Sequence, residues 1–123
     1  MAVRPSSTDL QKLLERDPDE PVVMLNLLRF RPDGGRESYD AYSRQARELL
    51  ARYGGEVVYY GEGSTVLVAE DGQAWDAVLL VRYPSRATFL KMLADPDYQR
   101  TTHLRSQALT EAVLQATVPI GRR

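Results

Sequence analysis

The stretch that decides the fold is PVVMLNLLRF, residues 21–30, an almost unbroken apolar run. It is too short to span a membrane, because a transmembrane helix needs about 20 apolar residues. A continuous apolar run of this length is typical of a central strand that is covered on both faces. Successive side chains of a strand point to opposite faces. The two apolar faces are Met24, Leu28 and Phe30 on one side, and Val23, Leu25 and Leu27 on the other.

Helical and strand patterns alternate on either side of this run. Before it, residues 8–16 predict a short helix in which Thr8 and Gln11 form a capping box. After it, Gly54-Gly55 predicts the left-handed end of a long helix. The expected elements are a helix at 38–53, strands at 56–61 and 76–83, a weaker strand at 64–69, helices from Ser85 and from Asp95-Pro96 to about 105, and a last strand at 110–118.

This order, without the weaker strand, is the βαββαβ pattern of an α+β, ferredoxin-like fold. The chain is short enough for one domain, so residues 1–123 are expected to form it, with the helix at 8–16 as an extension. In such a fold, helices cover one face of the sheet and leave the other bare. Since both faces of the central strand are apolar, a second copy is expected to cover the bare face. The prediction is a homodimer formed by sheet-face packing, a dimeric α/β barrel.

Composition excludes several classes of function. The 16 basic and 17 acidic residues give a net charge of −1, which argues against nucleic acid as a partner. The chain has no cysteine, so disulfides, thiolate metal sites and thiol nucleophiles are excluded. A single histidine without clustered acidic residues predicts no metal site. No signal segment or membrane span is visible in the sequence, and the expected location is cytoplasmic.

Several segments resemble one known group of proteins, the dimeric α/β-barrel (ferredoxin-like) superfamily. Within it, the chain is similar to an uncharacterised family, domain of unknown function thirteen-thirty. The resemblance covers residues 20–118. The segments that match are MLNLLRFR at 24–31, YGGEV at 53–57, YG at 60–61, VRYPS at 81–85, DPDYQ at 95–99 and LR at 104–105.

This resemblance implies a homodimer and a small-molecule pocket. Relatives in the superfamily include cofactor-free quinone-forming monooxygenases, haem-degrading monooxygenases, haem proteins like chlorite dismutase, and lactone isomerases. They hold small, flat or aromatic ligands between the helices and the sheet. We therefore expect a cleft between the helix at 38–53, the helices at 85–105 and the sheet. Because the likeness is one of fold, it does not identify a ligand.

Three polar residues are the candidate catalytic groups. His103 is the only histidine, so any imidazole base must be this residue, although a surface histidine is the commoner case. Asn26 interrupts the apolar strand and either completes a structural network or points into the pocket. Arg29 lies near the end of the same strand. It forms either a salt bridge with Glu62, Asp76 or the partner subunit, or a clamp for a carboxylate or enolate.

Aromatic side chains supply the candidate substrate-binding residues. Tyrosines outnumber phenylalanines seven to two, and a buried phenol needs a hydrogen-bond partner, which favours a polar cleft over a dry core. Tyr42, Tyr59 and Tyr83 are the candidates, with Trp75 at the entry to a long strand. Tyrosines at helical spacing are also common in ordinary cores.

Two functions remain open from the sequence. One is small-molecule binding with catalysis, as a cofactor-independent monooxygenase or isomerase acting on an aromatic or carbonyl metabolite. Its roles would be His103 as base, Asn26 and Arg29 at the developing oxyanion, and Tyr42 and Tyr59 around the ring. The other is a non-catalytic binding or structural dimer module. Neither requires a cofactor.

Overall fold

The computed structural model describes residues 4–121, so both ends of the expected domain 1–123 lie outside the described part. Its elements follow the order helix, strand, helix, strand, strand, three helical segments and strand. They are α1 (Ser7–Leu13), β1 (Val22–Phe30), α2 (Gly35–Arg52), β2 (Glu56–Glu62), β3 (Ala77–Tyr83), α3 (Arg86–Ala94), α4 (Pro96–Gln99), α5 (Thr102–Ala108) and β4 (Leu109–Thr117).

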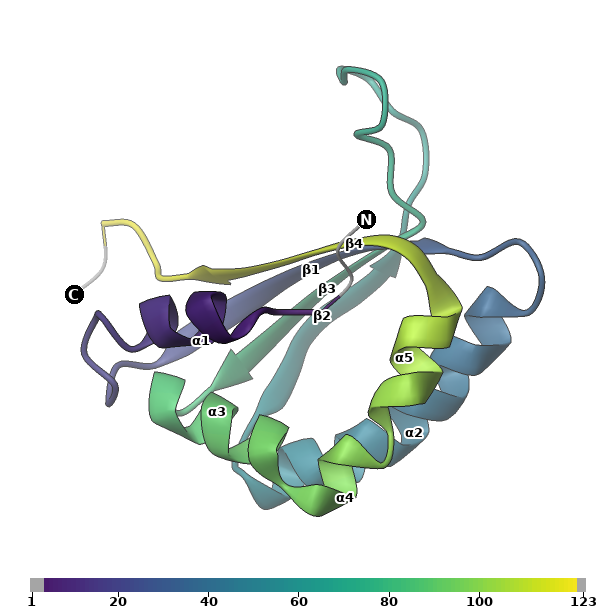
Figure 1. Cartoon of the computed structure of the whole chain (residues 1–123). Coiled ribbons are helices and arrows are strands. Elements are labelled where there is room, and N and C mark those ends of the chain that lie inside the picture. Colours follow the sequence, from purple (N-terminus) through teal and green to yellow (C-terminus); the bar gives the residue numbers. More distant parts are fainter. Residues whose placement is uncertain (1–3, 122–123) are drawn as a thin grey trace.

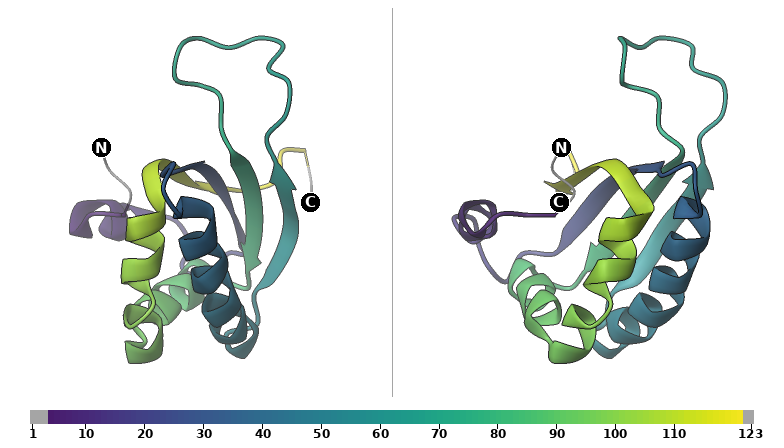
Figure 2. Two further views of the ribbon diagram at one scale, coloured as in Figure 1. Left: turned by 90° about the vertical axis from the view of Figure 1, so that its right-hand side faces the viewer. Right: turned by 45° about the vertical axis from the view of Figure 1, so that its right-hand side comes forward.

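The strands form one antiparallel sheet in the order β2-β3-β1-β4, which confirms the ferredoxin-like βαββαβ prediction. The apolar run forms β1 and lies between β3 and β4, as its composition predicts. The helices pack on one side of this sheet (Figures 1 and 2). The sheet is open, with β2 and β4 at its edges, so a single chain does not close a barrel.

The core lies between the helices and the side of the sheet that they cover, here called the helix face. Val22 and Leu28 of β1 are fully buried there, and Met24 is nearly so. The core divides into one cluster around Met24 and another around Leu28. Asn26 lies between them on the same face of β1, because alternate residues of a strand share a face. The apolar packing is therefore interrupted at Asn26.

No helix covers the opposite side of the sheet within residues 4–121 (Figure 2). The register of the strands places one group of side chains on that side, here called the open face. Its apolar members are Val23, Leu25 and Leu27 of β1, Val78 and Leu80 of β3, Val113 of β4 and Tyr59 of β2. The β1, β3 and β4 members are half-buried and Tyr59 is exposed. A patch of this kind is unusual on a monomeric protein.

The helix ends explain most of the boundaries. Ser85 caps α3 by accepting a hydrogen bond from the Thr88 amide, and Asp95 caps α4 by accepting one from the Asp97 amide, both as predicted. Gly54 adopts a φ of 76° beyond the end of α2, which confirms the predicted left-handed turn.

The predicted starts of two helices, α1 and α2, are wrong. The capping box of α1 is formed by Ser6 and Asp9, not by Thr8 and Gln11, and the helix spans Ser7–Leu13 and not residues 8–16. Ser6 precedes the helix with an extended backbone, and this conformation lets its side chain accept a hydrogen bond from the Asp9 amide. Helix α2 begins at Gly35 and not at residue 38, directly after Gly34, whose φ is 78°.

The predicted strand at 64–69 is also wrong. Residues 63–76 form a loop that projects beyond the end of the sheet (Figure 1). Leu67 and Val68 within it are 89% and 96% exposed. The segment has the composition of a strand, but no strand within residues 4–121 pairs with it, and composition alone does not provide a partner. The Gly63 amide donates to the Asp76 carbonyl over 2.8 Å and joins the two ends of the loop.

Candidate functional site

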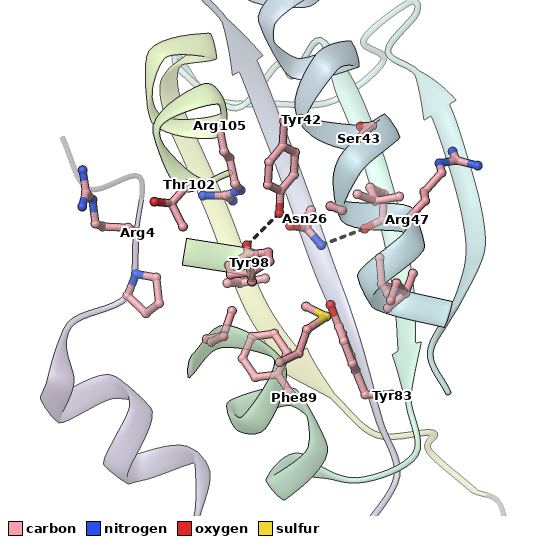
Figure 3. Close-up of a pocket in the computed structure, with 18 of the residues that line it drawn as sticks. Arg4, Asn26, Tyr42, Ser43, Arg47, Tyr83, Phe89, Tyr98, Thr102 and Arg105 are labelled. Atoms are coloured by element: carbon pink, nitrogen blue, oxygen red, sulfur yellow. Dashed lines mark hydrogen bonds between the residues drawn. The ribbon is translucent and has the colours of Figure 1, made fainter. Parts of the chain in front are cut away.

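A cavity of about 250 Å³ lies between the helix face of the sheet and helices α2 to α5. This is the location that the sequence predicted for a cleft. Figure 3 shows side chains from β1, β3, α2, α3 and α5 directed toward it, with Arg4 from the segment before α1 at one side. The cavity therefore occupies the place where the two core clusters separate.

Asn26 lies at the wall formed by β1 and is only 7% exposed. Its Nδ2 atom is 3.5 Å from the carbonyl oxygens of Met24 and Leu79. Both distances exceed the 2.7–3.2 Å, roughly, that is usual for an N–H···O hydrogen bond. A buried amide held this weakly retains the capacity to bind a ligand oxygen or nitrogen.

Tyrosines form the wall toward the helices. The hydroxyls of Tyr42 on α2 and Tyr98 on α4 are 2.7 Å apart and share a hydrogen bond (Figure 3). The rings of Tyr39 and Tyr42 lie 5.3 Å apart, and that of Tyr83 contacts Phe89 edge-on at 4.9 Å. Such contacts orient the rings, and the wall presents both ring surface and hydroxyl groups.

Burial raises the pKa values of Tyr39, Tyr42 and Tyr83 well above their ordinary range. The cause is desolvation, because a phenolate loses its hydration inside the protein. The positive charge of Arg105 opposes the rise at all three phenols and is the largest opposing effect at Tyr39. At neutral pH these phenols are protonated, so they donate hydrogen bonds and do not act as bases.

The charged side chains of the cavity wall are all positive among the described residues. Arg105 on α5 is 8% exposed, while Arg4 and Arg47 are exposed and lie where the cavity meets solvent. Among the described residues that line the cavity, there is no Asp, Glu, His or Lys. The wall therefore combines cationic groups with neutral hydrogen-bond donors.

Three of the seven residues that the sequence proposed line this cavity: Asn26, Tyr42 and Tyr83. The expectation that the other four share it is wrong. Tyr59 pairs with Leu80 and lies on the open face of the sheet, the far side from the cavity. A register shift between Val57 and Tyr59 sets this orientation, and instead it is Tyr60 that lines the cavity.

Arg29 and Trp75 meet each other on the open side, away from the cavity. Arg29 forms an ion pair with Glu111 and donates to the carbonyl oxygens of Gly72 at 2.9 Å and Ala74 at 2.6 Å. Its guanidinium lies 4.3 Å from the centre of the Trp75 ring. Arg29 therefore holds the loop 63–76 against the sheet. Of the two roles expected for Arg29, the structure shows the salt bridge, but its acidic partner is Glu111 and not Glu62 or Asp76.

His103 is exposed on α5 and does not line the cavity. The physical reason is helical spacing, since Thr102, Arg105 and Ser106 line the cavity at positions three and four apart. His103 lies on another side of the helix. It is not in place to serve as a base for a ligand in this cavity.

Arg105 and Tyr39 are the important residues that sequence reasoning did not place in the site. A signal for both was present. On α2, positions 39, 42, 43, 46, 47 and 50 recur at helical spacing, and all of them line the cavity. On α5 the corresponding signal is Arg105 itself, which lies at helical spacing from Thr102 on the side of the helix that faces the sheet.

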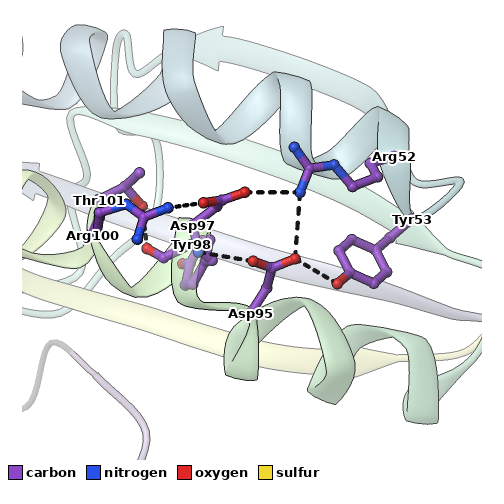
Figure 4. Close-up of polar contacts among 7 residues, drawn as sticks. All are labelled: Arg52, Tyr53, Asp95, Asp97, Tyr98, Arg100 and Thr101. Atoms are coloured by element: carbon purple, nitrogen blue, oxygen red, sulfur yellow. Dashed lines mark hydrogen bonds and ion pairs between the residues drawn. The ribbon is translucent and has the colours of Figure 1, made fainter.

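A polar cluster joins the end of α2 to the α3–α4 junction (Figure 4). The Tyr53 hydroxyl donates to Asp95 over 2.7 Å, and this hydrogen bond raises the pKa of Tyr53. Arg52 forms ion pairs with Asp95 at 3.5 Å and with Asp97 at 3.1 Å. Asp97 also pairs with Arg100. The DPDYQ segment thus anchors Tyr98 at the cavity wall.

Within residues 4–121, no group of three or more His, Cys, Asp or Glu side chains is arranged to hold a metal ion. No helix in that range is long and apolar enough to cross a membrane.

Comparison with solved structures identifies proteins of the same architecture. A protein of unknown function from Rhodopseudomonas palustris is 31% identical over 97% of both chains, with a TM-score of 0.89. Two other similarities show the fold alone. The hydroxynitrile lyase from Passiflora edulis is 15% identical over 86% of this chain and 99% of its own, with a TM-score of 0.66. A dimeric ferredoxin-like protein of unknown function from Jannaschia is 10% identical over 81% and 100%, with a TM-score of 0.62.

Comparison with protein families gives a match over most of the chain. Among curated proteins, none matches the sequence. The family model described as domain of unknown function, DUF1330, matches residues 34–117, which run from the start of α2 to the end of β4. Together with the Rhodopseudomonas protein, this match confirms the resemblance seen in the sequence. The chain belongs to the family of domain of unknown function DUF1330.

Proposed function

We propose that this protein binds a small, partly aromatic molecule in the cavity on the helix face, and that it does so as a homodimer joined through the open face. The observation that supports binding is the cavity itself, which interrupts the core at Asn26. Natural cores are close-packed and lose stability when a cavity is present. A cavity with hydrogen-bonding groups on its wall is consistent with an occupant.

The size and lining indicate the kind of molecule. An apolar cavity of about 150 Å³ accommodates benzene. The cavity here is about 250 Å³, which leaves room for one ring and a short substituent. Leu79 and Phe89 supply apolar contacts, while Asn26 and the Tyr42–Tyr98 pair supply polar ones.

The lining favours binding over proton abstraction by a side chain. A general base must reach the proton that it removes. His103 is exposed and outside the cavity, and the buried phenols are protonated at neutral pH. The binding function therefore has more support than a monooxygenase or isomerase that uses His103 as base.

The open face supports the dimer. Its half-buried valines and leucines have no cover within the described residues, and a second copy offers a surface of the same chemistry. The Jannaschia protein of the same fold is described as dimeric. Sheet-face packing would place the two cavities on the outer sides of the assembly.

The test is a ligand screen by thermal shift with phenols, quinones and keto acids. A ligand at about a hundred times its Kd stabilises the folded state by about 2.7 kcal/mol, which raises Tm by several degrees. In Ala46→Leu, three added carbons enter the cavity from α2, so the shift is expected to disappear. The matched control is Ala51→Leu, an exposed position of the same helix that does not line the cavity.

A shift that persists in Ala46→Leu would place the ligand elsewhere and contradict the proposal. If no compound of these classes shifts the Tm of the wild-type protein at millimolar concentration, the binding proposal fails as well. Loss in Ala46→Leu with retention in Ala51→Leu is the supporting result.

A further inference from the structure

The charge of the cavity wall carries more information than its shape. Three arginines line the cavity, at positions 4, 47 and 105, and the described lining contains no acidic side chain. The whole chain has a net charge of −1, so this local excess of positive charge is not a property of the composition. It is a local property of the cavity wall.

Arg105 is the arginine that matters, because it is 8% exposed whereas Arg4 and Arg47 face solvent. Figure 3 shows its guanidinium directed toward the Tyr42–Tyr98 pair. Its charge also affects the pKa values of Tyr39, Tyr42 and Tyr83, so it reaches across this part of the cavity. Attraction between charges is several times stronger at such a site than in water.

The neutral polar groups around Arg105 are, like its guanidinium, hydrogen-bond donors. The protonated phenols, the Asn26 amide and the Ser43 hydroxyl carry N–H or O–H donors at the cavity wall. An ionised carboxylate only accepts hydrogen bonds, and it accepts two at once from the planar guanidinium of arginine. A ligand with a carboxylate would match this end of the cavity.

The opposite part of the lining is apolar, with Val81, Phe89, Met92 and Leu93 from β3 and α3. We propose that the ligand is an organic acid, an apolar or aromatic body with one carboxylate, and that Arg105 binds the carboxylate. This inference rests on the proposed function, since it specifies what occupies the same cavity. It makes Arg105 the residue that determines specificity for acids over neutral molecules.

The test compares acids with their uncharged amides of nearly equal shape: benzoate with benzamide, and phenylacetate with phenylacetamide. Isothermal titration calorimetry is used with the wild-type protein, Arg105→Gln and Arg105→Lys. The matched control is Arg44→Gln, which removes a charge from an exposed position of α2 that does not line the cavity. Circular dichroism verifies that each variant is folded.

In the wild type, each acid is expected to bind about tenfold or more tightly than its amide, as a charge-assisted pair would give. Arg105→Gln is expected to weaken acid binding by about tenfold or more and to leave amide binding within about twofold, and Arg105→Lys falls between. Arg44→Gln leaves both affinities unchanged. A folded Arg105→Gln variant that still binds acids like the wild type would overturn the role of Arg105.

The wild-type comparison decides the ligand class even if Arg105→Gln does not fold. Equal binding of acid and amide would overturn this inference while leaving the small-molecule proposal in place. Failure of both acid and amide to bind the wild type at millimolar concentration would overturn the two proposals together.

Discussion

Asn26 is a polar residue in the one place where the sequence is most apolar. Its neighbours on the same face of β1, Met24 and Leu28, are core residues, and Asn26 is almost as buried as they are. A buried amide contributes little to stability when its hydrogen bonds are long. The binding proposal therefore gives Asn26 a role that the stability of the fold does not require.

Replacing Asn26 with Leu therefore separates stability from binding. The free energy of unfolding is expected to change by no more than about 1 kcal/mol, since a weakly bonded amide is exchanged for an apolar group of similar size. Ligand-induced stabilisation is expected to be lost. Leu28→Ala, two residues along the same face, is expected to cost roughly 2–5 kcal/mol. Urea denaturation with and without ligand measures both, and a large stability loss in Asn26→Leu would identify a structural role instead.

The buried phenols predict a dependence of stability on alkaline pH. A tyrosine in the unfolded chain titrates near pH 10, while the pKa values of Tyr39 and Tyr83 are raised by burial. Above about pH 10 the unfolded state releases protons that the native state retains, so stability falls as pH rises, by about 1.4 kcal/mol per pH unit for each phenol. Tyr83→Phe is expected to reduce this slope. Chemical denaturation from pH 8 to 11 tests it, and an unchanged slope in Tyr83→Phe would contradict it.

The sequence could have separated Asn26 from Arg29, because residues three apart on a strand point to opposite faces. Both stood out as polar interruptions of one apolar run, but only the even-numbered position shares the helix face with Met24 and Leu28. That Tyr60 and not Tyr59 lines the cavity was not predictable in the same way. A register shift in β2 reverses the alternation, and no turn residue in the sequence marks it.

At the scale of elements, the loop 63–76 is held to the sheet by the side chains of Arg29 and Asp76, and the Asp76 carboxylate accepts a hydrogen bond from the Phe30 amide. Arg29 donates to two loop carbonyls, stacks against Trp75 and pairs with Glu111 of β4. These contacts are all on the open side, and none of the side chains that make them lines the cavity. Trp75 is the only tryptophan of the chain and reports on this contact alone.

Arg29→Met is therefore expected to change the fluorescence of Trp75 and leave ligand binding intact. Loss of the cation–π contact and of two hydrogen bonds exposes the indole ring, which shifts its emission to longer wavelength and increases quenching by acrylamide. The control is Arg31→Met, an exposed arginine of the same region for which the structure shows no contact with Trp75. Loss of ligand binding in Arg29→Met would contradict the separation of loop and cavity.

Most elements could be predicted because each has a local signal. The caps Ser85 and Asp95, the turn at Gly54 and the apolar run of β1 all lie where the sequence indicated. Residues 64–69 show the limit of that reasoning. Their branched and apolar side chains favour extended backbone, but a strand also requires a neighbour, and neighbours are determined by the whole fold.

At the scale of the whole molecule, the asymmetry between the two faces of the sheet is the main feature. One face is covered by the helices and contains the cavity, and the other is apolar and uncovered within the described residues (Figure 2). The sequence predicted this asymmetry from the alternation along β1, because the count of helices was sufficient for one face only. The cavity between the covered face and the helices was predicted by resemblance, and its arginine was not.

The open face predicts that Leu25→Arg converts a dimer into a monomer. Leu25 lies in the centre of that face, opposite Leu80 and Gln115 on the two neighbouring strands. A charge placed between two packed sheets would be buried without a partner, which costs several kcal/mol of association free energy. Sedimentation velocity at micromolar concentration measures the change.

Leu67→Arg is the comparison for this variant, because the same charge enters an apolar position of the projecting loop. It is expected to leave the dimer unchanged. A wild-type protein that sediments as a monomer would contradict the proposed interface, as would a dimer disrupted by Leu67→Arg and retained by Leu25→Arg.

The loop 63–76 also offers a practical site for engineering. Its base is joined by the hydrogen bond between Gly63 and Asp76, and at Gly63 any side chain would collide with the Trp75 carbonyl, so this closure is tightly fitted. Arg29 also holds the loop by donating hydrogen bonds to the carbonyl oxygens of Gly72 and Ala74. Residues 64–71 extend past both, and lengthening a closed loop twofold costs only about 0.6 kcal/mol. An epitope or a labelled peptide grafted there would report on the protein from outside, while the sheet and cavity keep their geometry.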